Sequence, residues 1–354
     1  MPYPYNYTKL WEPIQINGMK LRNRISLSPM GTYTPRLDGT DTEEGMRYYE
    51  ERAKGGVGLI MTGAMFVNKQ LAQGSPGIAV WDYHSIPSTT VLTERCHRWG
   101  AKVCLQLSGG CNGAIDTGAT ENMFSASDNP NFFDPSIICH ALTIEEIKES
   151  LKDWAIDADI AVRSGFDAIE VHAHAGYIID QFMSPIWNRR TDEYGGSLEN
   201  RMRIVREIIE GIHRACGRDF PISVRINGCD YIPEGLQKAD AVEIAKLLEH
   251  YGVSCINVSS GGYENPAAFI EPCYFPEGWK KENALAVKAA VQIPVIAVNV
   301  IKHPETAEAL LREGVCDFAG VSRAQLADPD WVNKARGGHE ALLRKCIGCM
   351  SCNK

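Results

Sequence analysis

Short apolar runs alternate with longer amphipathic stretches along most of the chain, and this alternation restricts the fold more than any other feature. Eight runs have the length and β-branched content of buried strands. They are residues 25–29, 57–62, 102–107, 168–172, 222–226, 255–258, 295–298 and 318–321. Helical spacing is clearest at residues 43–54, 143–164, 197–216, 239–251 and 304–313. Strands that alternate with helices in this way form a parallel sheet.

Eight such units close most naturally into a (β/α)8 barrel, which occupies about 250 residues or more as one domain. The alternative is an open doubly wound sheet. That fold would need a glycine-rich phosphate turn after its first strand, and residues 28–31 (SPMG) do not form one. We therefore predict an α/β fold of the TIM-barrel type over residues 1–337, followed by a cysteine-rich extension at residues 338–354.

Composition limits the possible functions. The chain has 354 residues, of which 44% are hydrophobic and 23% charged, as in an ordinary soluble enzyme. No apolar run approaches the length of about 18 residues that a membrane span needs, and the net charge of -8 argues against a nucleic-acid partner. The first 13 residues lack the regions of a signal peptide, so we expect a cytoplasmic protein with mostly reduced cysteines.

Polar groups follow several predicted strands at their C-terminal ends, where the loops of a barrel build its active-site face. The residues at these ends are Met30, Ala64, Gln106, His172, His174, Tyr177, Arg225, Tyr263, Asn299 and Arg323. An amide, a guanidinium and imidazoles suit a polar heterocycle with a phosphate better than a metal, because no carboxylate and histidine set has ligand spacing. A purely structural alternative is that Gln106 and Arg225 pair with carboxylates at the barrel mouth.

Two adjoining segments carry a long and specific signature. Residues 171–185 are VHAHAGYIIDQFMSP, and residues 188–203 are NRRTDEYGGSLENRMR. Together with LRNRISLSPM at residues 21–30, they resemble the signature of the old yellow enzyme family, and the resemblance extends from about Leu10 to the C-terminus. It implies an FMN-binding (β/α)8 barrel and an NAD(P)H-linked oxidoreductase that acts on C=C bonds.

The resemblance also implies a set of cofactor-binding residues. It assigns the flavin ring to Pro29, Met30, Gly31, Ala64, Gln106 and Arg225, and the phosphate to Asn299, Val300, Ser322 and Arg323. Arg225 would place a positive charge where negative charge develops on reduction, and Gln106 offers both a donor and an acceptor. Gly31 stands where the family often has Thr or Cys. Val300 and Ser322 also depart from the usual residues, which makes the phosphate more dependent on backbone amides.

Catalytic roles follow from the same resemblance. Tyr177 matches the family's proton donor, and a phenol of pKa about 10 is protonated at neutral pH. His172 matches the first member of the pair that binds the substrate carbonyl, whereas His174 lies one position before the second, which is Ala175 here. Tyr263 stands where dienoyl-CoA reductases have an acidic histidine, and we expect it to assist. The structural alternative for Tyr177 is a rim tyrosine packed for its ring alone.

Three cysteines lie within the last nine residues: Cys346, Cys349 and Cys352. Their spacing suits a 4Fe-4S cluster and resembles the cluster segment of the long branch that contains 2,4-dienoyl-CoA reductase, 2-enoate reductase and trimethylamine dehydrogenase. A fourth cysteine would follow, so we expect the cluster segment to be incomplete in this chain. Zinc would also need a fourth ligand. Idle thiols in a frayed tail are the structural alternative.

Relatives in that branch continue into domains that bind FAD and NAD(P)H, and no strand-linked GxGxxG occurs in this chain. We therefore expect electrons to come from NAD(P)H, through FAD on a missing domain or a separate flavin protein. The other expected partner is a small-molecule substrate. We also expect that the protein forms a homo-oligomer and works under anaerobic conditions.

Taken together, these features predict an FMN-dependent ene-reductase that transfers hydride from reduced flavin to the β-carbon of an α,β-unsaturated carbonyl compound, with Tyr177 as proton donor. The segment NPNFFDPSIIC at residues 129–139 resembles a loop of 2-enoate reductases and favours unsaturated or aryl-acrylic acids over steroid enones and CoA thioesters. The alternatives are amine oxidation or demethylation, as in trimethylamine dehydrogenase, and a non-catalytic flavin relay.

Overall fold

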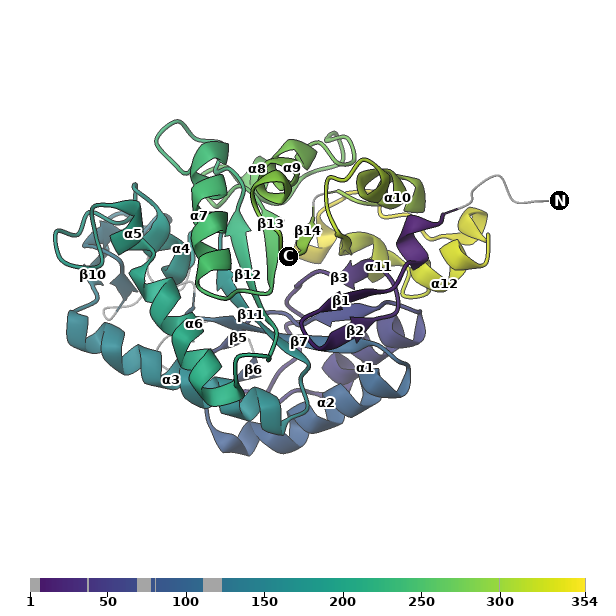
Figure 1. The fold of residues 1–354 in the computed structure, drawn as a ribbon, viewed down its shortest axis with the longest axis horizontal. Helices are drawn as coiled ribbons and strands as arrows, with labels where there is room; N and C mark the ends of the chain where they lie inside the picture. Colours follow the sequence, from purple (N-terminus) through teal and green to yellow (C-terminus); the bar gives the residue numbers. More distant parts are fainter. Residues whose placement is uncertain are drawn as a thin grey trace.

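The computed structural model describes residues 7–36, 38–68, 78–79, 81–110, 123–298 and 300–353. Eight parallel strands surround the centre of the molecule (Figure 1). They are β3 (Ile25–Leu27), β4 (Leu59–Met61), β7 (Lys102–Ser108), β11 (Ala168–Ala173), β12 (Ile222–Asn227), β13 (Cys255–Ser259), β14 (Val295–Ala297) and β15 (Phe318–Val321). Each strand pairs with its neighbour, and the pairings of β15 with β3 and of β7 with β11 close the ring. The predicted (β/α)8 barrel is confirmed, and an open sheet is excluded.

Helices cover the outside of the barrel (Figure 1). The longer ones are α1 (Glu43–Lys54), α2 (Ile86–Arg98), α3 (Ile144–Arg163), α6 (Arg203–Cys216), α7 (Lys238–His250), α9 (Lys281–Ala290) and α10 (Pro304–Arg312). The shorter ones are α4 (Ile178–Met183), α5 (Leu198–Arg201), α8 (Pro266–Phe269), α11 (Arg323–Ala327) and α12 (Trp331–Arg336). The segment predicted as one helix at residues 197–216 is thus divided into α5 and α6.

An antiparallel hairpin of β1 (Ile14–Ile16) and β2 (Met19–Leu21) precedes the barrel. Its buried residues Ile16 and Leu21 belong to one apolar cluster with Met61 and Phe318, which are barrel-strand residues. The hairpin therefore closes one end of the barrel with apolar side chains. It was not predicted from the sequence, and it leaves the opposite end, where the strands finish, available for a site.

The segment after β7 contains a small sheet of β8 (Phe124–Ser125), β9 (Asn129–Pro130) and β10 (Ile138–Ala141). A further short pair, β5 (Met65–Phe66) and β6 (Ile78–Ala79), extends the barrel sheet beside β7. The remaining elements are the single-turn 3-10 helices η1 (Lys9–Trp11), η2 (Tyr83–Ser85), η3 (Glu340–Leu342) and η4 (Ser351–Asn353).

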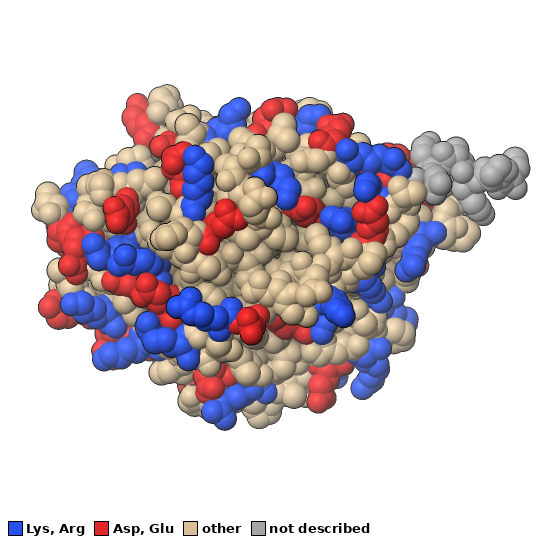
Figure 2. Space-filling model, in the orientation of Figure 1, with Lys and Arg blue, Asp and Glu red and all other residues tan. Residues whose placement is uncertain are grey.

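The surface carries both signs of charge. Figure 2 shows Lys and Arg interspersed with Asp and Glu on the face in view, without a broad area of one sign. Within the described part of the chain, no helix combines the length and the apolar character that crossing a bilayer requires.

Candidate active site

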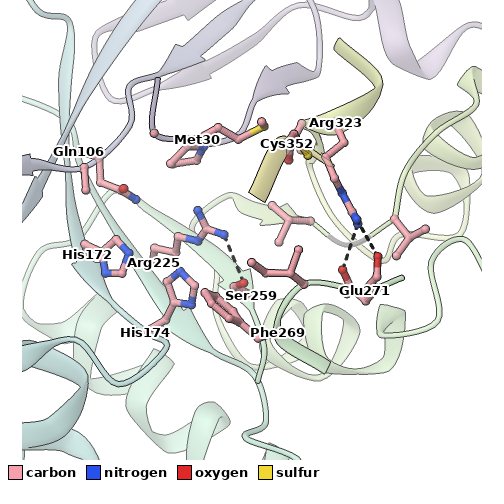
Figure 3. Close-up of a pocket in the computed structure, with 18 of the residues that line it drawn as sticks. Met30, Gln106, His172, His174, Arg225, Ser259, Phe269, Glu271, Arg323 and Cys352 are labelled. Carbon is pink, nitrogen blue, oxygen red and sulfur yellow. Dashed lines mark hydrogen bonds and ion pairs between the residues drawn. The ribbon is translucent and has the colours of Figure 1, made fainter. Parts of the chain in front are cut away.

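A cavity of about 290 Å³ lies at the C-terminal ends of the barrel strands. Of the predicted flavin and catalytic residues, it is lined by Pro29, Met30, Gly31, Ala64, Gln106, His172, His174, Tyr177, Arg225, Tyr263, Val300, Ser322 and Arg323. Cys346 and Cys352 also line it, whereas Cys349 does not, and Asn299 lies outside the described residues. In Figure 3, Gln106, His172 and His174 lie on one side of Arg225, and Arg323 and Cys352 lie on the other.

Gln106 is held by a buried carboxylate on the neighbouring strand. The register of β7 and β11 places Gln106 opposite Glu170, and its Nε2 donates to Glu170 Oε1 at 2.8 Å. The other oxygen of Glu170 accepts from Ser223 Oγ and Asn257 Nδ2, each at 3.0 Å. Gln106 thus pairs with a carboxylate, as the structural alternative supposed. The bond also fixes the amide, whose carbonyl and second N–H are left for a ligand.

Arg225 lies opposite His172 in the register of β11 and β12. Its Nη2 donates to Ser259 Oγ at 3.3 Å, and its buried Nε has no hydrogen-bond partner among the described residues. No carboxylate in the described part of the chain forms an ion pair with it. Burial lowers the pKa of Arg225, although the carboxylate of Glu170 opposes this. The guanidinium is therefore a buried cation with donors left to bind a ligand.

The two histidines form a neutral pair beside Tyr177. Their rings stack with centroids 4.6 Å apart, and the His172 and Tyr177 centroids are 4.1 Å apart. Burial and the charge of Arg225 lower the pKa of His172 to about 3 and that of His174 well below its usual range. A neutral imidazole keeps one N–H donor. Because both rings line the cavity and are neutral, the pair can donate a hydrogen bond to a carbonyl oxygen.

A histidine titration by NMR tests this electrostatic description. We expect the ring signals of His172 and His174 to stay constant from pH 8 to pH 5, because the pKa of His172 is lowered to about 3 and that of His174 is lowered well below its usual range. His84 is the matched control, since its hydrogen bond to Asp82 raises its pKa above 6.5 and its signals should move within the same range. Movement of the His172 signals near pH 6.5 would contradict the prediction.

Aromatic side chains form a continuous series on one side of the cavity. Phe269 lies 6.0 Å from His174 and 5.1 Å from Tyr263, centroid to centroid. Phe133, from the segment after β7, lies 5.9 Å from Tyr263 but does not itself line the cavity. The apolar rings give the cavity an aromatic wall next to the histidine pair, which Figure 3 shows for Phe269.

The end of the cavity at β14 and β15 carries an ion cluster. Arg323 donates through Nη1 to the backbone oxygen of Glu271 at 2.7 Å, and its Nη2 lies 3.3 Å from Glu271 Oε2. Lys280 Nζ lies 2.8 Å from the other carboxylate oxygen. Two cations thus share one carboxylate, which leaves a net positive charge. Val300 beside them has φ 46°, a genuine outlier for a β-branched residue, and such strain is concentrated at ligand sites.

Sequence reasoning missed four residues of this site: Glu170, Ser259, Phe269 and Glu271. Glu170 left one signal, a carboxylate inside an otherwise apolar strand. Glu271 lies in a loop, and nothing in the sequence indicates that it pairs with Arg323. Ser259 and Phe269 likewise have no local pattern that separates them from other residues.

The three terminal cysteines are not gathered into a metal site. Cys346 and Cys352 line the cavity, while Cys349 is exposed and its Sγ lies 3.5 Å from Ser351 Oγ. Over the residues that the structure describes, no three His, Cys, Asp or Glu side chains are placed to hold one metal ion.

The cavity fits FMN in its donors and its shape. One part offers the fixed amide of Gln106 and the buried guanidinium of Arg225, which suit the polar edge of a flavin ring. Gly63 directly precedes the lining residue Ala64, and a Cβ on it would come within 2.6 Å of the Met30 backbone oxygen, so the two segments pack closely here. The cationic end at Arg323 suits a phosphate, and barrel phosphate sites lie at the loops after the seventh and eighth strands.

Comparison with known proteins agrees with this geometry. The model of the family described as NADH:flavin oxidoreductase / NADH oxidase matches residues 9–341. A cinnamate reductase of Clostridium sporogenes is 34% identical over 364 aligned positions, which cover 97% of this chain and 55% of the relative. The chain thus spans about half the length of this relative.

Two solved structures have the same fold. A 2-naphthoyl-CoA reductase in complex with 2-naphthoyl-CoA has a TM-score of 0.89 and 27% identity, and the match covers 98% of this chain and 55% of that one. A histamine dehydrogenase from Rhizobium sp. 4-9 has a TM-score of 0.88 and 27% identity, covering 98% and 50% of the two chains. Since a reductase and an amine dehydrogenase match equally well, the fold does not separate the two chemistries.

Proposed function

The chain belongs to the NADH:flavin oxidoreductase / NADH oxidase family, and we propose that it is the FMN barrel of an ene-reductase acting on α,β-unsaturated carbonyl compounds. The observation that carries the proposal is the neutral pair of His172 and His174 packed against Tyr177 in a buried cavity. Membership of the family supports FMN as cofactor and NAD(P)H as electron source.

The FMN ring would be held by Pro29, Met30, Gly31, Ala64, Gln106 and Arg225, and its phosphate by Asn299, Val300, Ser322 and Arg323. When bound, FMN supplies the hydride that is added to the β-carbon of the substrate. The role of Arg225 is electrostatic, because a buried cation without a carboxylate partner favours negative charge on a neighbouring ring.

Replacing Arg225 with alanine should therefore weaken flavin binding. We expect wild-type protein to hold about one FMN per chain, and Arg225→Ala to lose flavin on gel filtration or to have a more negative flavin reduction potential, since reduced flavin loses its counter-charge. Arg24→Ala is the control, because Arg24 lies in the chain before β3 and does not line the cavity. An intact Arg225→Ala protein with unchanged flavin content and potential would contradict the assignment.

The protein's own groups would divide the reaction between them. His172, aided by His174, donates a hydrogen bond to the substrate carbonyl oxygen and so polarises the C=C bond. Tyr177 gives its phenolic proton to the α-carbon from the opposite side, and Tyr263 assists. Because both imidazoles are neutral, they bind the carbonyl as hydrogen-bond donors and leave protonation to Tyr177.

The substrate class we propose is a 2-enoate, including aryl-acrylic acids. The aromatic wall of Tyr263 and Phe269 suits a substrate ring, and a relative at 34% identity is a cinnamate reductase. Amine oxidation is the rival. An amine site needs an aromatic enclosure around a cation, whereas this cavity contains Arg225 and Arg323, whose positive charges oppose a second cation.

A substrate panel tests the function. Without oxygen, reduced holoenzyme is mixed with cinnamate, crotonate and a cyclic enone, oxidised holoenzyme is mixed with trimethylamine, and product is measured for each. We expect saturation of the enoates and no oxidation of the amine by the oxidised enzyme. Oxidation of the amine without reduction of any enoate or enone would overturn the proposal.

We also propose that Cys346, Cys349 and Cys352 supply three ligands to a 4Fe-4S cluster, and that electrons arrive from a flavin domain or partner protein. The support is the chemistry of three closely spaced thiols, two of which line the FMN cavity. Iron and sulfide analysis of anaerobically prepared protein should give about four of each. Bound zinc, or an iron content unaffected by Cys349→Ala, would contradict this assignment.

A further inference from the structure

We propose that Asp180 and Gln181 are positioning residues that set the orientation of Tyr177 by holding the backbone of Gly176. Neither side chain lines the cavity, so they act through the turn that joins His174 to Tyr177. The inference rests on the proposed function, because it concerns how the proposed proton donor is placed.

The turn between the two catalytic residues has an unusual backbone. Ala175 has φ 62° and Gly176 has φ 80°, so two consecutive residues lie in the left-handed region. A non-glycine residue is uncommon there and persists only where its surroundings hold it. Tyr177 follows Gly176 directly, so any change in the backbone of this turn would change the orientation of the Tyr177 side chain.

Two buried side chains form hydrogen bonds with Gly176, one with its backbone N–H and one with its backbone carbonyl. Asp180 Oδ2 accepts from Gly176 N at 2.7 Å, and Gln181 Nε2 donates to Gly176 O at 2.7 Å. Both side chains come from α4, whose N-cap is Tyr177 itself. Asp180 is 4% exposed and Gln181 is fully buried, so water cannot readily replace either bond.

The holding side chains are themselves anchored to the barrel. Asn227, at the end of β12, donates through Nδ2 to Asp180 Oδ2 at 3.1 Å and to Asp230 Oδ1 at 2.8 Å. Gln181 Oε1 accepts from Ser125 Oγ at 2.7 Å, which ties it to β8. The turn at Gly176 is therefore connected through Asp180 to β12 and through Gln181 to β8.

Two substitutions of Asp180 differ in whether they keep an oxygen that can accept the hydrogen bond from Gly176. Burial and the neighbouring Asp230 raise the pKa of Asp180, which favours the neutral form of its carboxyl group. An asparagine of the same shape keeps a carbonyl oxygen that can accept from Gly176 N, whereas alanine removes the acceptor. If the bond to Gly176 is what matters, Asp180→Asn should behave like the wild-type protein and Asp180→Ala should not.

The experiment measures the rate at which an enoate reoxidises the reduced holoenzyme. We expect Asp180→Ala to slow this step about tenfold to hundredfold, because small misplacements of a reacting group cost rates of this order. Asp180→Asn should restore most of the rate. Asp157→Ala is the matched control, since Asp157 is a fully buried aspartate on α3 without a hydrogen-bond partner in the described structure. It should leave the rate unchanged.

A double-mutant cycle separates positioning from general damage. With Tyr177→Phe already present, Asp180→Ala should slow reoxidation no further, because the donor it positions is absent. An additional slowing of the same size would overturn the inference, as would equal losses in Asp180→Asn and Asp180→Ala. If Asp180→Ala does not fold, Gln181→Met provides the same test. Failure of the proposed function itself would be distinct, because Tyr177→Phe alone would then have no effect.

Discussion

Tyr177→Phe should slow reoxidation of the reduced enzyme by an enoate about 10² to 10⁴-fold, the usual cost of losing a positioned general acid. The change removes only the phenolic oxygen, and the ring that packs 4.1 Å from His172 is kept. Stability and flavin content should therefore change little. Reduction of the enzyme by its electron donor does not use this proton and should proceed at close to the normal rate.

Rapid mixing without oxygen, followed at the flavin absorbance band, measures the two half-reactions separately. Tyr274→Phe is a suitable control, because Tyr274 is 70% exposed and does not line the cavity. Equal slowing of both half-reactions in Tyr177→Phe would mean that Tyr177 organises the site instead of donating a proton. An unchanged oxidative half-reaction would remove Tyr177 from the mechanism.

The barrel could be predicted from the sequence because its signals are local and repeated. The helix at residues 43–54 was predicted to its exact bounds, since Thr42 caps it by accepting from Gly45 N at 3.2 Å. The run at residues 318–321 likewise matches β15. The hairpin of β1 and β2 was missed because its strands have three residues each, too few to show a period of two.

The sequence predicted the site residues that lie at the C-terminal ends of strands. It did not predict the residues on neighbouring strands that hydrogen-bond to them. Gln106 and Arg225 follow from the rule that strand ends face the barrel mouth. Glu170 and Ser259 hold these two residues through contacts between different strands. The spacing along the chain does not specify such contacts, because they depend on the register of neighbouring strands.

Positive charge dominates both ends of the proposed flavin site, for different physical reasons. Arg225 forms no ion pair with a carboxylate among the described residues; it donates to Ser259 and is stabilised from a greater distance by the charges of Glu170 and Glu271. Arg323 is paired, but its partner Glu271 is shared with Lys280, so a net charge remains. This distribution favours an anionic cofactor and an anionic or carbonyl substrate, in agreement with FMN and an enoate.

Removing one partner of the buried pair of Lys280 and Glu271 should cost more stability than breaking any exposed ion pair of the described chain. Lys280 Nζ lies 2.8 Å from Glu271 Oε1, and the two side chains are 0% and 5% exposed. Glu271→Ala would leave the ammonium group buried without its counter-charge, which typically costs about 3–5 kcal/mol in the free energy of unfolding. Arg323 would lose its contact with the Glu271 carboxylate at the same time and would keep only its bond to the backbone oxygen of that residue.

The neighbouring residue supplies a matched control. Lys281 Nζ lies 2.8 Å from Glu313 Oε2, the same separation, but these side chains are 42% and 51% exposed. Glu313→Ala should cost less than about 1 kcal/mol, because water and salt screen the pair. Urea unfolding of holoenzyme at fixed FMN concentration compares the two variants. Adding Lys280→Met to Glu271→Ala should recover much of the loss, since the fully buried ammonium group that lost its counter-charge would be removed as well. Equal costs for Glu271→Ala and Glu313→Ala would show that burial does not decide the strength of these pairs.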